Sequence, residues 1–395
     1  MCSECIVFIG VGIMPYHIAG DKNFLLDLAK YLNNKGFQTK FISIAETPDT
    51  SDVSFVSKNH FYFISRPFHD KKKFFYHKDQ TGKIIGYHHK HGPSREFFEL
   101  TLTLLFHRSK LRGILREHPR VIIHWTDLSL LTPVVRLVFG RKPYYVCSVL
   151  RYVPKGWIGN IMRSHAVNVA NTILTSNKAG RKLWARYGSY FSRIAIAPWG
   201  TVNPLSNSIK CVRQLRKNHD EKVKLLWTGF IQQIGEPDFL RTVSLAKSVI
   251  ESRLDIQFTF CLKPEFFRGK YLSLQSPGIL IRKGDEMFID ELVEYDALLS
   301  PVFRTDSSMA PPLTWIEALS VGLPIITTRT LGIDELLTDK KSALIFDNYE
   351  KIKFWLSKEE NIHLKLQNLR KGSRTEFLKR YSMNIVGEQY LKIYK

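Results

Sequence analysis

The sequence predicts an α/β protein of parallel β-sheets flanked by helices in a doubly wound arrangement. Near the start, residues 5–14 form an apolar strand, about 21–34 a helix and 37–44 a second strand. Farther on, a strand at 297–302 leads through a Ser- and Pro-bearing loop into a short helix and then a strand at 325–328. Such strand–loop–helix–strand units build parallel sheets. At 395 residues the chain is also long enough for two or three domains.

The same alternation continues between these two stretches. Hydrophobic periodicity predicts one amphipathic helix at about 94–117. Further strands are predicted at 121–127, 144–149, 171–176, 224–228, 256–262 and 278–283. Residues 57–95, rich in histidine and aromatic side chains, are predicted to be a solvated loop, with a loop that reaches over an acceptor or lipid headgroup as the functional alternative. A metal tract at His88-His89-x-His91 is disfavoured, because no carboxylate or cysteine stands at ligand spacing.

Composition narrows the class of protein. Hydrophobic residues make up 44% of the chain, which is typical of a globular protein. The longest apolar runs are of strand length, so no transmembrane helix is expected, and the run at residues 6–14 indicates a buried strand rather than a signal peptide. Five scattered cysteines do not predict a disulfide framework, and Cys2-x-x-Cys5 lacks a second pair at zinc spacing. We expect a protein of the reducing cytoplasm that needs no metal or other cofactor.

The positive charge is concentrated in the first half of the chain. Residues 1–205 contain 29 Lys and Arg against 12 Asp and Glu, whereas residues 206–395 contain 29 against 24. Asp127 and Asp220 are separated by a stretch without any carboxylate, in which basic residues are interleaved with aromatic ones. This pattern favours a surface facing an anionic membrane or a lipid pyrophosphate over nucleic acid, although a basic protein kept soluble by its charge is the plain alternative.

The loop and short helix of the later unit carry chemistry as well as fold. Ligands of parallel sheets bind at the carboxyl ends of the strands, where this loop lies. Backbone N–H groups at a helix start suit phosphate. Glu317, one turn into the helix, is placed to accept hydrogen bonds from the vicinal hydroxyls of a sugar. The stretch therefore predicts a binding site suited to a phosphate and to the hydroxyls of a sugar.

Here the chain resembles the GT-B-fold glycosyltransferases, in particular the large retaining family with two glutamates seven residues apart. Residues 317–324, EALSVGLP, are similar to that family's Glu-Ala-Met-Ala-x-Gly-x-Pro, and residues 331–336, LGIDEL, to its Gly-Gly-x-x-Glu-Leu. The resemblance implies two Rossmann-like doubly wound domains facing across a cleft, with a C-terminal helix crossing back to the first domain. It also implies a nucleotide-sugar donor, most simply a UDP- or GDP-sugar.

The resemblance also implies the domain boundaries. Residues 197–200, APWG, are similar to the segment that closes the family's first domain, and residues 381–394 resemble its final helix. We expect an acceptor-binding domain at 1–205, a linker at 206–222, a nucleotide-sugar-binding domain at 223–378 and a C-terminal helix at 379–395 that packs on the first domain.

Four positions tied to catalysis in the retaining family differ here. Met309 stands at the first glutamate, Ser148 at a histidine that faces the donor, and Phe230 at an arginine of the pyrophosphate clamp. The clamp's lysine has no counterpart. The run from Pro311 to Glu317 is closer to a Pro-Leu-Lys-x-x-Glu version of the motif found in other GT-B enzymes, some of them inverting. Both stereochemical courses therefore stay open.

The candidate site residues follow from these comparisons. For the nucleotide we predict Glu317, Gly229, Leu313, Thr314, Arg282, Lys283 and Lys263, and for the donor phosphate loop Gly20 and Pro312. For catalysis we predict His17, Asp127 and Arg304, the last replacing the lost positive charge, and for the acceptor His124, for which a buried core histidine is an equal alternative. If the enzyme is inverting, the general base comes from the first third of the chain, among His17, Asp21, Glu46, His124 and Asp127.

The predicted function is metal-independent transfer of a sugar from a nucleotide-sugar to a lipid-linked or otherwise anionic acceptor. We expect a peripheral protein at the inner face of the membrane, bound through the basic first domain. The alternative is a catalytically inactive GT-B-like partner or scaffold that keeps the fold after losing the donor clamp. A nucleic-acid partner is not expected, because it rests on charge alone.

Overall fold

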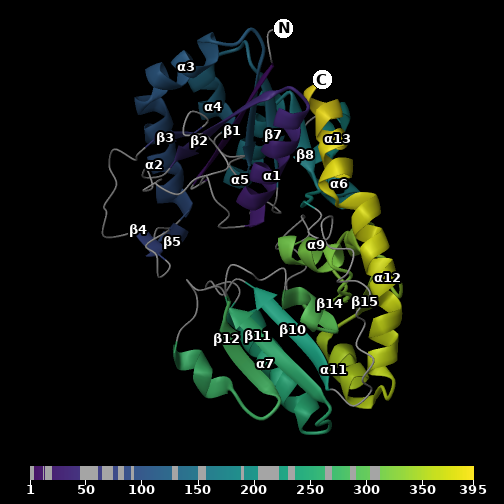
Figure 1. The fold of residues 1–395 in the computed structure, drawn as a ribbon. Coiled ribbons are helices and arrows are strands. Elements are labelled where there is room, and N and C mark those ends of the chain that lie inside the picture. The colour runs from purple at the N-terminus through teal and green to yellow at the C-terminus, as the bar shows by residue number, and fades with distance from the viewer. Residues whose placement is uncertain are drawn as a thin grey trace. The chain divides into compact units, whose positions relative to one another are not determined.

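The computed structural model of the chain contains two compact units (Figure 1). The structure describes residues 4–11, 13, 20–44, 61–64, 74–78, 84–89, 93–126, 132–149, 157–187, 191–202, 222–229, 236–262, 269–284, 291–302 and 312–395. Unit 1 takes in the described residues up to Trp199 together with residues 386–395, and unit 2 takes in those between Gly200 and Ile385.

Unit 1 is built on a parallel sheet of seven strands in the order β3-β2-β1-β6-β7-β8-β9. The strands are β1 (Cys5–Val11), β2 (Gln38–Ile44), β3 (Phe61–Ile64), β6 (Val121–Thr126), β7 (Tyr144–Ser148), β8 (Thr172–Thr175) and β9 (Ile194–Ile196). From β1 the chain first builds outward through β2 and β3, then returns to the other side of β1 with β6. The gap between β1 and β6 is therefore the topological switch point, where sheets of this kind bind ligands.

Helices cover both faces of this sheet. They are α1 (Gly20–Asn34), α2 (Pro93–Phe106), α3 (Arg108–Arg116), α4 (Thr132–Phe139), α5 (Trp157–Val169), α6 (Lys178–Ala185) and the later part of α13 (Met383–Tyr394). Side chains alternate between the faces of a strand. In β1, Val7 and Ile9 join the core under α2 to α5, while Phe8 faces the opposite side, where its ring lies 5.4 Å from Phe41.

The segment predicted as one helix at 94–117 is two helices, so that prediction is wrong in part. His107 separates α2 from α3 with φ −88° and ψ 10°, which departs from helical geometry. On either side of this residue, α2 buries Leu100 and Leu104 and α3 buries Leu111 and Ile114 in the same core. Periodicity alone did not reveal the break, because no Gly or Pro marks it.

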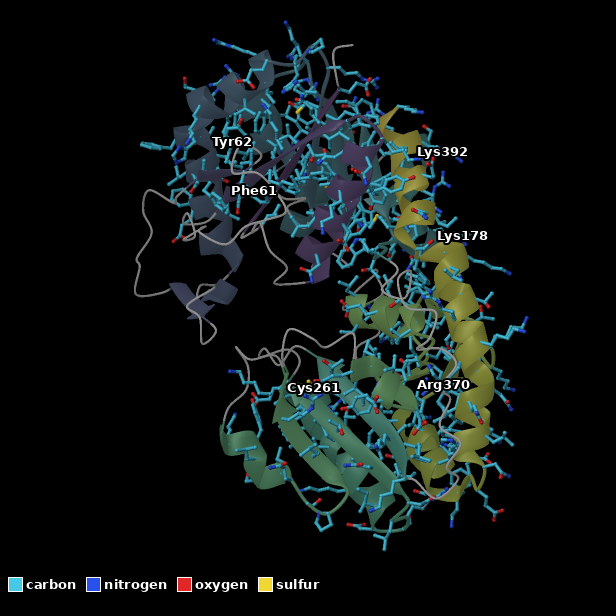
Figure 2. All side chains as sticks on the ribbon, in the orientation of Figure 1. Phe61, Tyr62, Lys178, Cys261, Arg370 and Lys392 are labelled. Atoms are coloured by element: carbon cyan, nitrogen blue, oxygen red, sulfur yellow. The ribbon has the colours of Figure 1, made fainter. Side chains whose placement is uncertain are left out.

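The prediction of a loop over residues 57–95 is also wrong in part. Residues 61–64 form the edge strand β3, in which the Phe61 ring stacks on Phe41 at 4.6 Å. Figure 2 labels Phe61 and its neighbour Tyr62 on this strand. Two further strands, β4 (Phe74–Lys78) and β5 (Ile84–His89), form an antiparallel hairpin. The aromatic residues that suggested an exposed loop are good strand formers.

Unit 2 repeats the design with a parallel sheet of six strands in the order β12-β11-β10-β13-β14-β15. The strands are β10 (Val223–Gly229), β11 (Ile256–Leu262), β12 (Ile279–Lys283), β13 (Ala297–Leu299), β14 (Ile325–Thr328) and β15 (Ala343–Phe346). The helices are α7 (Glu236–Ile250), α9 (Leu313–Ser320), α10 (Ile333–Leu336), α11 (Tyr349–Lys358) and α12 (Ile362–Arg380). The order reverses between β10 and β13, which is the switch point of this sheet.

The predicted division into domains stays a prediction. Most of the predicted linker, residues 206–221, lies outside the described residues. From Val386 onward the chain belongs to unit 1, where Tyr31 donates a hydrogen bond of 2.6 Å to Glu388. No described helix is both long and apolar enough to cross a bilayer.

Candidate functional site

The candidate donor site lies at the carboxyl edge of the unit 2 sheet. β10 and β13 flank the switch point, and they end at Gly229 and Leu299. Gly229 is level with Leu262 of β11, which is level with Lys283 of β12. Since neighbouring strands are about 4.8 Å apart, the Lys283 backbone lies about 10 Å from Gly229 along this edge. The register thus brings Gly229 and Lys283 to one rim, and their predicted contact with a nucleotide stays a prediction.

Gly229 has a packing reason for being glycine. A Cβ at this position would come within 2.8 Å of the Trp227 ring, which is buried beneath it. The indole in turn packs against Phe239 of α7, with ring centroids 5.3 Å apart. The close approach of backbone and ring leaves the Gly229 peptide half-buried at the rim. Its predicted contact with donor phosphate remains a prediction.

Helix α9 presents one polar face. Six of its eight residues are buried, and the two that are not, Thr314 and Glu317, are three positions apart. Residues at i and i+3 lie on the same side of a helix. Pro312 is the N-cap and makes no side-chain cap hydrogen bond, so its side chain satisfies none of the first-turn N–H groups, among them those of Leu313 and Thr314. This combination of backbone donors, a hydroxyl and a carboxylate suits a ribose and a phosphate.

The segment leading toward α9 is anchored at its start. After β13, the Ser300 carbonyl accepts a hydrogen bond of 2.8 Å from Thr327, and the Ser300 hydroxyl accepts one of 2.8 Å from the indole of Trp315 in α9. Two residues on, Val302 donates its N–H to the Thr328 hydroxyl at 2.9 Å, and that hydroxyl donates to the Val302 carbonyl at 2.6 Å. Strand β14 therefore fixes the point at which the chain leaves the sheet.

The turn after α9 is equally constrained. Gly322 has a φ of +77°, a conformation that favours glycine. A Cβ there would also lie 3.2 Å from the Arg370 carbonyl of α12. Arg374 of α12 donates to the Ser320 carbonyl at the end of α9. These contacts hold α9 against α12 and orient its polar face.

The predicted cations at this edge differ in their surroundings. Arg282 forms an ion pair with Glu291 and lies 3.5 Å from the Tyr295 hydroxyl. Burial alone would lower the pKa of Arg282, but the hydrogen bonds to Glu291 and Tyr295 raise it overall. The guanidinium therefore stays charged, and its charge is already paired with a carboxylate of unit 2. Lys283 is exposed, and no ion pair to it occurs among the described residues. Lys263 and Arg304 lie outside the described residues.

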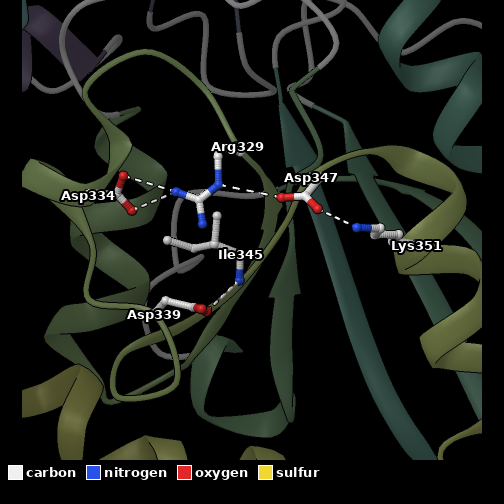
Figure 3. A network of polar contacts seen from close by, with 6 residues as sticks. All are labelled: Arg329, Asp334, Asp339, Ile345, Asp347 and Lys351. Atoms are coloured by element: carbon white, nitrogen blue, oxygen red, sulfur yellow. Dashed lines mark hydrogen bonds and ion pairs between the residues drawn. The ribbon is translucent and has the colours of Figure 1, made fainter.

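A further cation at this edge, Arg329, was missed by the sequence analysis. It follows β14 directly, and its side chain binds both carboxylate oxygens of Asp334, at 2.9 and 3.0 Å (Figure 3). Its Nε lies 3.6 Å from Asp347, which also pairs with Lys351. Hydrogen bonding to Asp334 raises the pKa of Arg329. Only its place after a strand could have signalled it, and no motif marks that place.

Unit 1 buries His124 instead of presenting it. The ring is 1% exposed, its Nδ1 lies 2.6 Å from the Tyr394 hydroxyl and its Nε2 lies 2.6 Å from the Ser148 hydroxyl. Burial lowers the pKa of His124 to about 3, so the ring is neutral at pH 7. The structure thus favours the core alternative for His124, and its role toward an acceptor stays a prediction that this burial does not support. Ser148, which stands at the family's donor-facing histidine, is buried in the same network.

The other predicted residues of unit 1 follow strands at the switch point. Gly20 is the first residue of α1, and nothing further is described of it. In the sequence, His17 stands between β1 and α1 and Asp127 directly follows β6, and β1 and β6 are the strands on either side of the switch point. His17 and Asp127 are outside the described part of the chain, and so is the alternative base Glu46. For Asp21, another alternative base, the backbone is described but the side chain is not.

Among the described residues, no group of three or more His, Cys, Asp or Glu side chains could hold a metal ion.

Comparison with known proteins defines the fold. No protein-family model matches the sequence. Three solved structures are similar over nearly the full length of both chains. TarM from S. aureus, in complex with fondaparinux, α-GlcNAc-glycerol and UDP, has a TM-score of 0.71 at 9% identity and covers 100% of each chain. Sucrose-phosphate synthase from Thermosynechococcus elongatus has a TM-score of 0.71 at 14% identity, covering 99% of this chain and 98% of that one. HepE from Anabaena, in complex with UDP-glucose, has a TM-score of 0.67 at 11% identity and covers 98% of each chain.

A curated protein is similar in sequence as well. Spore coat protein SA of Bacillus subtilis (strain 168) is 24% identical over 251 residues, which are 58% of this chain and 65% of that protein. The match therefore spans less than two thirds of the length of that relative. The structural likenesses confirm the predicted fold: two Rossmann-like parallel sheets with surrounding helices, as in GT-B glycosyltransferases.

Proposed function

We propose that this chain is a glycosyltransferase that takes its sugar from a UDP-sugar. The carrying observation is the polar face of α9, formed by Thr314 and Glu317, at the switch-point edge of unit 2. The fold is that of glycosyltransferase structures, and two of the similar structures hold UDP or UDP-glucose. These complexes favour UDP over GDP, which was an equal alternative from the sequence.

In this proposal the ribose and the diphosphate of the donor have partners in unit 2. The Glu317 carboxylate accepts hydrogen bonds from the ribose hydroxyls, a role for which a half-buried carboxylate on a fixed helix is suited. The amides of Leu313 and Thr314, with the Thr314 hydroxyl, bind phosphate at the start of α9. Pro312 shapes this loop but has no N–H to donate. Gly229 lets the backbone approach the diphosphate closely.

The positive charge toward the diphosphate comes from Lys283 in this proposal. Its long flexible stem and exposed ammonium can reach a ligand without breaking an existing ion pair. In addition, Arg304 and Lys263 keep their predicted roles in this proposal. Arg304 stabilises the leaving phosphate, and Lys263 binds the nucleotide. Arg282 is supported less, because Glu291 already accepts its hydrogen bonds.

The reaction breaks the bond between the sugar's anomeric carbon and the diphosphate oxygen and forms one to an acceptor oxygen. The diphosphate leaves with the bonding electron pair, and the acceptor hydroxyl loses its proton. In an inverting course a base removes that proton, and His17 and Asp127 are the proposed groups, each following a strand at the unit 1 switch point. In a retaining course the leaving diphosphate is stabilised by fixed donors while the acceptor attacks from the same face.

We propose a lipid-linked or otherwise anionic acceptor, held by unit 1 at the surface of the membrane. The net charge of +17 over residues 1–205 supports an anionic partner. We further propose that the protein is peripheral at the inner face of the membrane and works without a metal ion.

A catalytically inactive GT-B-like scaffold is the second candidate. It is favoured by one observation: both arginines described at the donor edge, Arg282 and Arg329, are paired with carboxylates. An active site that stabilises a diphosphate usually keeps such charges available. The two candidates differ in whether a nucleotide binds.

Thermal stability with UDP, GDP, ADP and CDP and their sugars, with and without a divalent metal, tests the proposal. We expect UDP and a UDP-sugar, but none of the other nucleotides or their sugars, to raise the melting temperature, following mass action. Glu317→Ala should abolish the shift, whereas Glu317→Gln should retain part of it, because the amide oxygen still accepts hydrogen bonds. Glu251→Ala is the matched control, since this exposed glutamate follows the end of α7.

Two outcomes would reject the proposal. No shift with any nucleotide at millimolar concentration would favour the scaffold. An equal shift in wild type and Glu317→Ala would place the nucleotide elsewhere in the chain.

A further inference from the structure

Helix α2 of unit 1 carries apolar side chains on its outer face. Its inner face buries Leu100 and Leu104 in the core. Phe98 and Phe106 are nevertheless 61% and 71% exposed, and Leu102, midway between them, is half-buried. Residues at i, i+4 and i+8 follow one line along a helix. A surface helix that packs on a core normally has polar residues on its solvent-facing side. This exposed row of apolar side chains therefore indicates a surface that binds another molecule.

The neighbouring helix α4 repeats the pattern. It packs against α2, α3 and α5 in the layer that covers this face of the sheet (Figure 1). Val135 and Val138 point into the core, while Pro133 and Leu137 are exposed, Leu137 to 55%. The outward faces of adjacent helices in one layer turn to the same side. We call Phe98, Leu102, Phe106, Pro133 and Leu137 the outer ridge.

Basic residues follow both helices of the outer ridge in the chain, and we call Lys110, Arg112, Arg141 and Lys142 its border. Arg112 of α3 donates hydrogen bonds to the carbonyl of Val138, at 2.7 Å, and to that of Leu137, at 3.4 Å, which places its charge beside the end of α4. Lys110, Arg141 and Lys142 are exposed nearby in the chain. Between residues 98 and 149 the described residues include eight Lys and Arg but two carboxylates, Glu99 and Glu117. Glu99 is buried and Glu117 pairs with Lys40, so neither offsets the border.

We propose that the outer ridge is a docking surface for an anionic lipid bilayer. Apolar side chains that enter the headgroup–acyl boundary, bordered by Lys and Arg that contact anionic headgroups, form the arrangement by which a surface helix binds a membrane. The inference deepens the proposed function and rests on it in one respect, namely that the acceptor is lipid-linked. The surface itself is defined independently of the donor site.

The charge border argues against a second copy of the chain as the partner. In a symmetric dimer through this ridge, the same basic residues would face one another, and like charges across an interface are unfavourable. An anionic lipid surface complements them. Two aromatic residues of the carboxylate-free stretch between Asp127 and Asp220 favour the ridge as the membrane contact, because Trp184 is 2% exposed and the Tyr187 ring lies under the Arg163 guanidinium, 4.4 Å from its carbon.

Vesicle co-sedimentation of the full chain tests the proposal. We expect the protein to pellet with phosphatidylcholine vesicles that contain about 30 mol% phosphatidylglycerol, and to be released as NaCl rises from about 0.05 to about 0.5 M. The ridge variant Phe98→Ser/Phe106→Ser/Leu137→Ser should bind at least about tenfold more weakly. The border variant Lys110→Glu/Arg141→Glu/Lys142→Glu should lose at least about tenfold as well, since each cation contributes roughly fivefold.

Unit 2 supplies matched controls for both variants. Phe354→Ser/Leu364→Ser/Leu378→Ser removes three exposed apolar side chains of α11 and α12, which are 67%, 52% and 45% exposed. Lys358→Glu/Lys371→Glu/Lys379→Glu changes the net charge by the same amount as the border variant. We expect both controls to bind vesicles as wild type does. Equal losses in the controls and in the ridge and border variants would overturn the proposal, because binding would then depend on overall composition.

Two further results would also overturn it. One is a wild-type protein that does not pellet with anionic vesicles at low salt. The other is concentration-dependent self-association that the ridge variant abolishes, which would identify a second copy as the partner. UDP-dependent thermal stabilisation of the ridge variant, measured in parallel, separates the two proposals. A stabilised variant that has lost vesicle binding supports the ridge, whereas vesicle binding without any UDP effect rejects the donor proposal and leaves the ridge standing.

Discussion

The two sheets use the polar groups of their inner strands in opposite ways. In unit 1, His124 and Ser148 bond to each other, and Tyr394 closes over them, so the polar atoms are consumed inside a core. In unit 2, Thr327 and Thr328 bond to the chain that leaves β13, so the polar atoms fix the start of a loop. The same sheet topology thus buries the polar groups of the inner strands in unit 1 and uses them to fix the start of a loop in unit 2. The comparison teaches that ligand-contacting residues are expected in loops whose starts are hydrogen-bonded to a strand.

The largest expected effect on stability concerns two glycines at which the backbone of α12 or α13 packs closely against its own unit. A Cβ on Gly372 of α12 would come within 1.9 Å of the Lys341 carbonyl, which is backbone, while one on Gly387 of α13 would meet the side chain of Tyr31 at 2.3 Å. Because a backbone contact relaxes less readily, Gly372→Ala should lower the free energy of unfolding of unit 2 by about 3 kcal/mol or more. Gly387→Ala should cost less in unit 1. Denaturant unfolding monitored by hydrogen exchange measures the free energy of unfolding of each unit in the two variants. An equal loss of stability in both would contradict the expected difference.

The next effect concerns acid stability, and it should be confined to unit 1. The pKa of His124 is about 3 in the folded protein and about 6.5 when the ring is exposed, so below pH 6.5 the unfolded chain binds a proton that the folded chain does not. The free energy of unfolding should fall by about 1.4 kcal/mol per pH unit, or about 3 kcal/mol by pH 4.5, with no such effect above pH 6.5. Amide exchange of β6 peptides between pH 7 and 4.5 measures this. His124→Gln should flatten the slope and the exposed His165→Gln should not, while an unchanged slope in His124→Gln would refute the assignment.

A smaller effect tests the positioning role in unit 2. Thr328→Val removes the hydroxyl that both accepts from and donates to Val302. We expect a loss of about 1–2 kcal/mol in stability. The concentration of UDP needed for half-maximal thermal stabilisation should rise severalfold, because the start of the loop is no longer held. Thr328→Ser keeps the hydroxyl and should behave as wild type. A stability loss without any change in UDP response would limit Thr328 to a structural role.

The smallest effect distinguishes the two neighbouring cations of β12. Lys283→Ala should weaken UDP binding by roughly fivefold, about 1 kcal/mol, with little change in stability. Arg282→Ala should do the reverse, because it breaks the contact with Glu291. Isothermal titration with UDP, paired with thermal unfolding, measures both quantities. The opposite ranking would assign the donor charge to Arg282.

Most strands of the two parallel sheets and the donor motif could be predicted because their signals are local. The strand at 256–262 was predicted with its observed bounds, and so was 325–328, since both are short apolar runs between loop residues. The motif at 317–324 predicted a helix and turn, and the structure adds why Gly322 is required there. These features depend on neighbours within one turn or one strand.

What the sequence could not show depends on partners far along the chain. His124 could have been an acceptor contact or a core residue, and the decision rests on Tyr394, 270 positions later. Arg282 was a candidate ligand until Glu291 was found beside it. The outer ridge was hidden because Phe98 and Leu102 look like core residues in any hydrophobic pattern. Their outward direction depends on which face of α2 meets the sheet.

The position of α13 also orders events during synthesis. Residues 386–394 complete the core of unit 1, yet all of unit 2 precedes them in the chain. A ribosome therefore delivers unit 2 while the sheet of unit 1 still lacks one covering helix. Until Tyr390 and Tyr394 arrive, the face that carries His124 and Phe8 is open to water and to other nascent chains. The N-terminal half of this protein is the last to be finished.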